Sequence, residues 1–474
     1  MREPTPPVIE PCTEVTGRLG PPAGAMTRAF ILAAILIALT AGGGWGVWLL
    51  FVIGGRGSFT EVSIHGVNAH GQAQVFGWMS LLVIGLLYAL LPHLWRCTLA
   101  WPRLAWAVLC LLVAGVAVRW LGLAMAGQGH AAAQAALAGG LAQMLAIMLF
   151  VAQSLATWHR SGARIEPWTG FVFAAMALFV FQAGFSTWHL WQTMTADSRA
   201  DLLWYLATYQ APLRDVQLRG FGLLMLLGLS IWLLPAMYGL GPVSPRRAWA
   251  ALLVLLAGLT VAVTAFIGWR FTGARSGTGF LYLSWIAMIV GICMIALPWR
   301  LWWPMPVVDA GAKFIRAAFA WLAVSFAMLL LLPGHRILSG IDFSHAYYGA
   351  IRHAIAMGFI SMLLIGVLSR LMRMRGETPG RPAAHAFWGP FILLNAGCAL
   401  RVLAQTSSDF ASPAFYLLGV SGVLELAAIG WWGVNLVGPG RRRAAATADV
   451  GPPPSPEQPS GGSPLPRPGT VSLS

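Results

Sequence analysis

The chain has 474 residues, of which 58% are hydrophobic and only 9% are charged. A soluble domain usually carries about 25% charged residues, so this chain has too few charges to cover a water-soluble surface of its size. The composition therefore excludes an ordinary cytosolic enzyme, a disordered chain and a small disulfide-stabilised scaffold. It leaves a polytopic membrane protein whose helices each span about 20 apolar residues.

Apolar runs long enough to span a membrane follow one another along most of the chain. The twelve runs lie at 29–53, 72–92, 104–125, 132–156, 169–192, 216–238, 248–269, 278–300, 314–333, 350–372, 386–404 and 413–438. Such runs are typical of transmembrane helices, so we predict an all-α polytopic membrane protein with a twelve-helix transmembrane domain at residues 28–438.

The two ends of the chain differ from this domain in composition. Residues 1–27 are mostly polar and rich in proline, and we predict a disordered extension in which Met26 could be the start of translation. Residues 439–474 are rich in proline, glycine and serine, a composition that cannot build a packed core. We therefore predict a disordered C-terminal tail.

The basic residues indicate how the helices are oriented. There are 30 Lys and Arg against 15 Asp and Glu, and 20 of the 30 fall on the side that holds both chain ends if the turns alternate. Cytoplasmic loops carry the excess of basic residues, so we predict a protein of the bacterial inner membrane with both termini in the cytoplasm. The arginines are scattered without a basic stripe, so their excess indicates topology among lipids and no nucleic-acid partner.

Three segments repeat the same glycine spacing on every fourth predicted helix. Each has a first repeat glycine and, eight residues later, a second one: Gly77 and Gly85, Gly220 and Gly228, Gly358 and Gly366. Glycines eight residues apart lie close to one helix face, where another helix or a flat ligand can approach. The recurrence predicts three four-helix units related by pseudo-threefold symmetry, whereas many transporters divide into two six-helix halves.

Two histidines stand at the predicted outer ends of repeat-bearing helices. His70 precedes Gly77, His353 precedes Gly358, and the repeat predicts that the two histidines occupy equivalent places. Neutral imidazoles on two helices are suitable axial ligands for a haem iron, and the nearby glycines would leave room for the porphyrin. The alternative is a pair of interfacial histidines bonded to backbone or water.

Other polar residues could complete such a site. Arg214 and Arg352 could pair with haem propionates, or they could be rim charges that face headgroups. His65 and His345 could add an outer copper site, or they could be loop residues. Glu425 lies within a predicted span, where a carboxylate either serves function or belongs to a local ion or hydrogen-bonded pair.

These segments resemble a known family. Residues 70–78 (HGQAQVFGW) resemble the H-G-x-x-Q-x-F-G-W signature of NnrS-like membrane haem proteins. Residues 352–354 (RHA), with the two repeat glycines and Arg370, resemble the R-H-A segment of that family, and residues 214–217 (RDVQ) resemble its middle segment. The resemblance implies that Gln74 and Gln217 also lie beside the cofactor. It extends more distantly to subunit I of heme–copper oxidases, which has twelve helices in three four-helix arcs.

The resemblance implies haem, possible copper binding, and a role in nitric oxide tolerance during denitrification or in membrane electron transfer. The partners would be a small gas such as nitric oxide and an electron-donor protein or quinol. One departure matters: the helices predicted at 216–238 and 248–269 contain no histidine for a second metal. We therefore expect no complete binuclear centre. A divergent nitric oxide or oxygen reductase subunit and a cofactor-free transporter are the alternatives.

Overall fold

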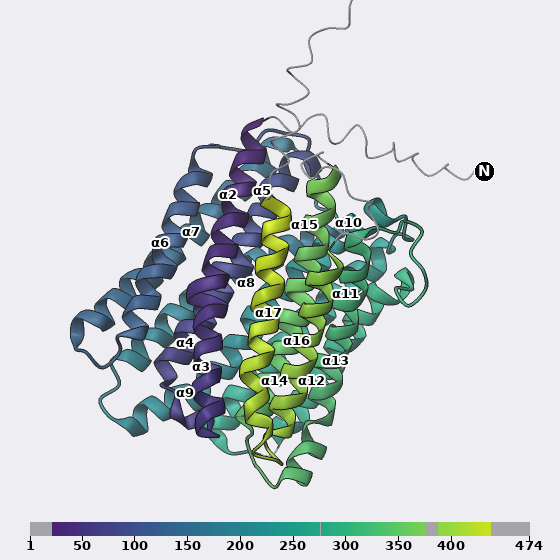
Figure 1. Cartoon of the computed structure of the whole chain (residues 1–474). Helices are drawn as coiled ribbons and strands as arrows, with labels where there is room; N and C mark the ends of the chain where they lie inside the picture. Colours follow the sequence, from purple (N-terminus) through teal and green to yellow (C-terminus); the bar gives the residue numbers. More distant parts are fainter. Residues whose placement is uncertain (1–20, 275, 375–386, 438–474) are drawn as a thin grey trace, which may run out of the picture. The chain divides into compact units, whose positions relative to one another are not determined.

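The computed structural model describes residues 21–274, 276–374 and 387–437, and every element of regular secondary structure in these ranges is a helix (Figure 1). Eight of its long helices are single elements: α6 (Leu104–Ala124), α7 (His130–Ser161), α8 (Pro167–Met194), α11 (Pro245–Thr272), α12 (Ser276–Ala296), α13 (Ala310–Ser339), α16 (Trp388–Ser407) and α17 (Ala414–Val437). Short 3₁₀ turns precede α4 and follow α12: η2 (Phe59–Glu61) and η5 (Leu297–Trp299).

The four remaining helices are each interrupted by a π-helical segment. They are α2 (Pro21–Ile37), η1 (Ala38–Gly42) and α3 (Gly43–Arg56); α4 (Ile64–Gln72), η3 (Ala73–Met79) and α5 (Ser80–Leu94); α9 (Arg199–Asp215), η4 (Val216–Leu223) and α10 (Leu224–Tyr238); α14 (His345–His353), η6 (Ala354–Ser361) and α15 (Met362–Met374). We call α4–α5, α9–α10 and α14–α15 the inner helices, and the end of the bundle where α4, α9 and α14 begin the distal end.

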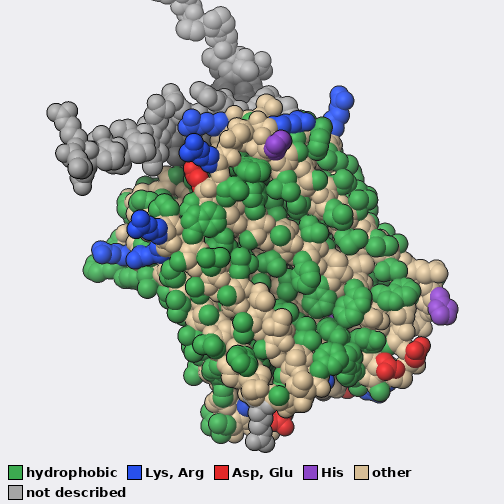
Figure 2. Space-filling view, turned by 180° about the vertical axis from the view of Figure 1, so that it is seen from behind, with side chains coloured by type: hydrophobic (Ala, Val, Ile, Leu, Met, Phe, Trp, Pro, Cys, Tyr) green, Lys and Arg blue, Asp and Glu red, His purple; other side chains and the backbone are tan. Residues whose placement is uncertain are grey.

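The prediction of an all-α polytopic membrane protein is confirmed. Eleven of the twelve helices in the described ranges are long and apolar enough to cross a membrane. The twelfth, α16, is 20 residues long and contains Asn395 and Arg401. Hydrophobic side chains cover most of the middle of the face in Figure 2, and charged side chains lie towards its edges.

Two predicted boundaries need correction. The first helix begins at Pro21, so residues 21–27 belong to it and not to the N-terminal extension. The sixth begins at Arg199, well before the predicted residue 216, because Ser198 caps α9 by accepting a hydrogen bond from the Asp201 amide. Its charged residues and Pro212 concealed this part of the helix from an apolar criterion. The extension at 1–20 and the tail at 439–474 lie outside the described residues.

The pseudo-threefold repeat is present in the packing. In each unit the second repeat glycine meets a phenylalanine of the preceding helix: a Cβ added at the glycine would lie 2.7 Å from the Phe30 Cβ, 2.6 Å from the Phe171 Cβ or 3.1 Å from the Phe314 Cβ. The first repeat glycine meets the residue seven positions after that phenylalanine, which is Ile37, Leu178 or Trp321. The same register in three helix pairs establishes the three units over the described residues.

These contacts also decide what the repeat glycines do. They let the inner helices pack closely against α2, α8 and α13, and side chains of those helices fill the space beside them. The expectation that the glycines leave room for a porphyrin is therefore wrong. The alternative of close helix packing is the one that the structure supports.

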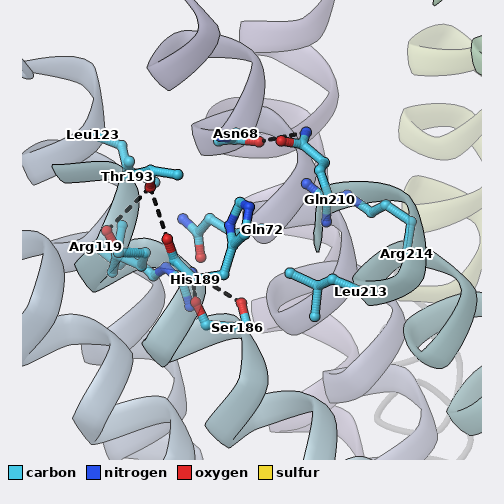
Figure 3. A pocket seen from close by; sticks show the side chains of 11 residues that line it. Asn68, Gln72, Arg119, Leu123, Ser186, His189, Thr193, Gln210, Leu213 and Arg214 are labelled. Carbon is cyan, nitrogen blue, oxygen red and sulfur yellow. Dashed lines mark hydrogen bonds between the residues drawn. The ribbon is translucent and has the colours of Figure 1, made fainter. Parts of the chain in front are cut away.

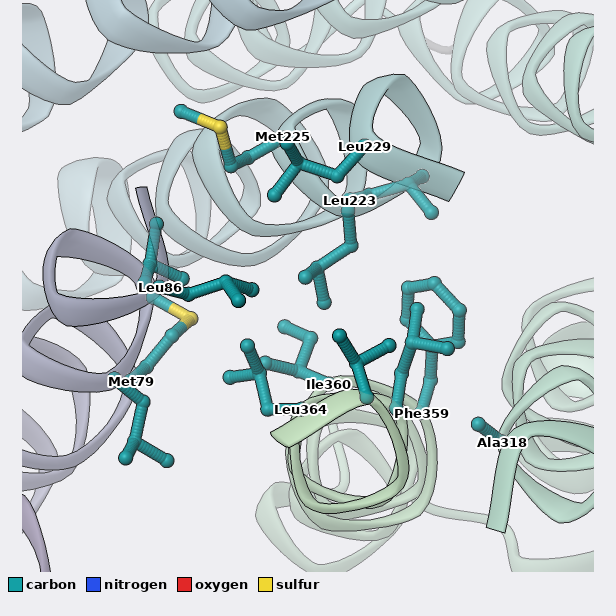
Figure 4. Close-up of a cluster of buried hydrophobic side chains, with 14 of the residues drawn as sticks. Met79, Leu86, Leu223, Met225, Leu229, Ala318, Phe359, Ile360 and Leu364 are labelled. Atoms are coloured by element: carbon teal, nitrogen blue, oxygen red, sulfur yellow. The ribbon is translucent and has the colours of Figure 1, made fainter. Parts of the chain in front are cut away.

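The inner helices meet at the centre of the bundle. Each first repeat glycine is the fifth residue of its π segment. The residues two positions later, which lie near the pseudo-threefold axis, are Met79, Gly222 and Ile360. A Cβ at Gly222 would lie 2.7 Å from the Ile360 Cδ1 and 3.3 Å from the Met79 Sδ. The Trp78 indole donates a hydrogen bond of 2.9 Å to the Ser361 hydroxyl and joins two inner helices. Figure 4 shows the apolar core around Met79, Ile360 and their neighbours.

The close packing of α6 on α7 leads to a stability prediction. A Cβ at Gly122 would lie 2.6 Å from the carbonyl oxygen of Ala132, a backbone atom that cannot turn away. Gly122→Ala should therefore destabilise the protein by about 1–3 kcal/mol, as overpacking does in other cores. Thermal unfolding in detergent measures the effect. Gly184→Ala is the control, since nothing lies within 4 Å of that Cβ position, and equal unfolding temperatures of the two variants would contradict the prediction.

Candidate functional site

Positions in the three units correspond when they lie at the same distance from the first repeat glycine, and polar residues can be compared on this basis. Five residues before the first repeat glycine stand Gln72, Asp215 and His353 in the three inner helices. His353 therefore corresponds to Gln72, and His70 lies two residues earlier, where the other inner helices have apolar side chains. The prediction that the two histidines occupy equivalent places is wrong, because their distances from the repeat glycines differ.

In the third unit, His353 pairs with a carboxylate. Its Nε2 lies 2.9 and 3.0 Å from the two carboxylate oxygens of Glu425, which projects from α17 and is mostly buried. Arg401 on α16 interacts electrostatically with Glu425, and its guanidinium donates a hydrogen bond of 3.4 Å to the Leu418 carbonyl. Glu425 thus belongs to a local pair, as one of its two sequence interpretations predicted.

His70 is positioned by the first helix. Its Nδ1 lies 2.9 Å from the carbonyl oxygen of Gly42, the last residue of η1. The imidazole ring occupies a cradle at Gly46, where an added Cβ would lie 2.5 Å from the ring carbon Cε1. His70 and His353 come from different inner helices and lie near enough to interact electrostatically. Each ring therefore has one nitrogen in a hydrogen bond and one left for another partner.

In the first unit, neutral amides occupy the corresponding positions. Gln143 on α7 takes the place of Glu425, and its Nε2 donates a hydrogen bond of 2.8 Å to the Gln72 Oε1. Arg119 on α6 takes the place of Arg401 and donates a hydrogen bond of 3.1 Å to the Gln143 Oε1. The first and third units thus contain the same polar constellation in two chemical versions, an amide version and an ionisable one.

The two predicted propionate partners lie inside the bundle at equivalent positions. Arg214 donates a hydrogen bond of 2.8 Å to the Gln217 Oε1, and Gln217 in turn donates one of 3.0 Å to Gln182. Arg352 interacts electrostatically with Asp215, whose carboxylate forms an ion pair with Arg219. Both arginines are partly buried, so the interpretation of them as freely exposed rim charges does not hold.

The other predicted site residues are placed as follows. Gln74 lies beside η1, since its amide is 3.4 Å from a Cβ built at Gly42, and its buried Oε1 has no hydrogen-bond partner. His65 near the start of α4 has a buried Nδ1 without a partner, and the ring of His345 packs edge-on against Phe343. Within the described ranges, no three His, Cys, Asp or Glu side chains gather as a metal ion would require.

Sequence reasoning missed several buried polar residues. Arg119, Gln143 and Arg401 are the main ones. The two arginines had a signal in the sequence, because each follows a glycine by four residues, Gly115 in α6 and Gly397 in α16. A further cluster at the distal end joins His335 to Asp409 at 2.7 Å, and Ser344 donates to the same carboxylate. Tertiary contacts between helices distant in sequence create all of these groups.

Comparisons with known proteins give no match for this chain, either among protein-family models or among curated proteins. The test of a cofactor therefore rests on the residues themselves. Two imidazoles, each oriented through one nitrogen by a carbonyl or a carboxylate, form the donor set that a bis-histidine haem requires. The donor chemistry of His70 and His353 fits haem.

Proposed function

We propose that this chain is a haem-binding membrane protein of the NnrS-like kind, with His70 and His353 as the two axial ligands. The observation that supports it is the pairing of each imidazole with an orienting group on a neighbouring helix, Gly42 for one and Glu425 for the other. Haem-ligating histidines need such a partner because it fixes the tautomer and the ring orientation.

The surrounding residues have definable roles in this proposal. The Gly42 carbonyl accepts the Nδ1 proton of His70 and leaves Nε2 as the ligating atom. Glu425 holds the Nε2 of His353 and leaves Nδ1. Arg352 precedes His353 in the chain, and Arg214 lies beside Gly71, the residue after His70, so both could pair with propionates. Gln74 and Gln217 line the same level of the inner helices.

The bound haem would supply binding of a diatomic gas or one-electron transfer. We propose nitric oxide as the gas, in nitric oxide tolerance or denitrification, and a donor protein or quinol as the source of electrons. The proposed location is the bacterial inner membrane with the distal end facing outwards, as the bias of basic residues supports. We propose no copper site at His65 and His345, because neither belongs to a group of three His, Cys, Asp or Glu side chains within the described ranges.

An absorption spectrum of the purified full chain tests the proposal. Protein expressed with a haem supply should show a Soret band and contain about one haem per chain by pyridine haemochrome assay. Metal analysis should find iron in the same proportion. Colourless, metal-free protein would contradict the proposal and favour the cofactor-free transporter.

A further inference from the structure

A small polar cavity lies between the first and second units near the distal end. It has a volume of about 20 Å³, room for about one water-sized group. Helices α4, α6, α8 and α9 provide its walls (Figure 3). The lining side chains are Asn68, Gln72, Arg119, Leu123, Ser186, His189, Leu190, Thr193, Gln210, Leu213 and Arg214.

The lining contains two arginines and no carboxylate. Arg119 is only 5% exposed, and it donates hydrogen bonds to neutral partners: the Gln143 amide and the carbonyl and hydroxyl of Ser186. Arg214 likewise donates to the neutral Gln217. A buried charge is costly unless an opposite charge accompanies it.

Two further nitrogen atoms of the lining side chains lack hydrogen-bond partners. His189 is 5% exposed, and its Nε2 has no partner. The Nε of Arg119 is buried without a partner as well. Figure 3 shows Arg119 and Arg214 on opposite sides of the cavity with His189 between them. The two arginines therefore offer positive charge and N–H donors, and the lining contains no negatively charged group to accompany them.

Comparison with the other two units shows that Arg119 lacks the acidic partner that its equivalent in the third unit has. In the third unit, the residue equivalent to Gln143 is the carboxylate Glu425, which accompanies Arg401. In the second unit, both the arginine and its partner are replaced, by Ala262 and Met288. Among these three equivalent positions within the described ranges, the arginine of the first unit alone lacks an acidic companion.

We infer that this cavity binds a small monovalent inorganic anion between Arg119 and Arg214. The anion would supply to Arg119 the negative charge that Glu425 supplies to Arg401 in the third unit. The volume suits chloride or nitrite and excludes bulkier anions such as phosphate esters. The inference shares Arg214 with the proposed propionate partners, but it does not require haem, because Arg119 and His189 have no part in the haem proposal.

Anion-dependent thermal stability of the detergent-solubilised full chain tests the inference. The protein is exchanged into sodium gluconate, and sodium chloride or sodium nitrite is added at constant ionic strength. A ligand that binds the folded state stabilises it in proportion to the logarithm of its concentration above Kd. The unfolding temperature of the unmodified protein should therefore rise with either anion.

Two substitutions sharpen the test. Arg119→Gln removes the charge and should weaken the apparent affinity for the anion at least tenfold. Gln143→Glu introduces the carboxylate of the third unit, so it should raise stability in gluconate and abolish the response to added anion. Arg199→Gln, at an exposed position, is the control and should respond like the unmodified protein.

Separate outcomes decide this inference and the haem proposal. A response that survives in His353→Ala but is lost in Arg119→Gln and Gln143→Glu supports an anion beside Arg119. The same response in all variants, or no response in the unmodified chain, overturns the inference whatever the haem content. A response lost together with haem in His353→Ala would also overturn it, because the added anion would then act through the haem and not through this cavity.

Discussion

Replacing either His70 or His353 by alanine is expected to reduce the haem content from about one per chain to less than a tenth. Each imidazole is one of two axial ligands in the proposed site, and a methyl group cannot bind iron. The absorption spectrum and the pyridine haemochrome assay of each purified variant measure the loss. A variant that keeps some haem should show a shifted Soret band, since one axial ligand has changed.

His130→Ala is the matched control, because His130 is an exposed histidine at the start of α7. It should retain the spectrum of the unmodified protein. Gly46→Val offers a second approach, since its side chain would occupy the cradle of the His70 ring and displace the ligand without removing it. Unchanged spectra in both histidine variants would disprove the assignment of the ligands.

Replacing Glu425 by leucine is expected to lower the stability of the haem-free protein by about 3 kcal/mol, the lower end for removing one partner of a buried ion pair. The substitution leaves the Nε2 of His353 without its acceptor and Arg401 without an acidic neighbour. The folded fraction in a denaturant titration in detergent measures the effect for protein made without added haem.

Gln143→Leu is the matched variant at the equivalent position of the first unit. It removes two hydrogen bonds of a neutral amide, one of which comes from the charged Arg119, so its effect should be about 2 kcal/mol and smaller than that of Glu425→Leu. Glu425→Gln should fall between the unmodified protein and the leucine variant, since an amide can still accept from His353. Equal stabilities of the two leucine variants would show that the charge of Glu425 does not contribute.

The three units therefore share a backbone plan and differ in polar content. The first carries Arg119 with amides, the second carries Ala262 and Met288, and the third carries Arg401 with Glu425. Residues that maintain the helix register are kept in all three, because the repeat glycines must meet the preceding helix closely. The polar side chains near the distal end differ between the units, because the contacts of the repeat glycines do not constrain them.

Much of the fold was predictable because its causes are local. Apolar runs indicated the twelve helices, and the eight-residue glycine spacing indicated the three units, which the packing of Gly85, Gly228 and Gly366 confirms. The prediction failed where a helix did not look apolar: α9, with Arg214 and Pro212, extends an inner helix well past its apolar part. Continuous hydrogen bonding and capping, rather than hydropathy, set that boundary.

The candidate site was predictable only in part. The sequence by itself indicated that His70, His353 and Glu425 are unusual, because polar groups at membrane depth require partners. It could not show that Glu425 pairs with His353, or that Arg119 faces a cavity without a carboxylate. Those outcomes depend on the tertiary structure, since the partners come from different helices and π segments shift the helix register. Helix formation follows from neighbouring residues, whereas the meeting of distant side chains is decided by how the helices pack.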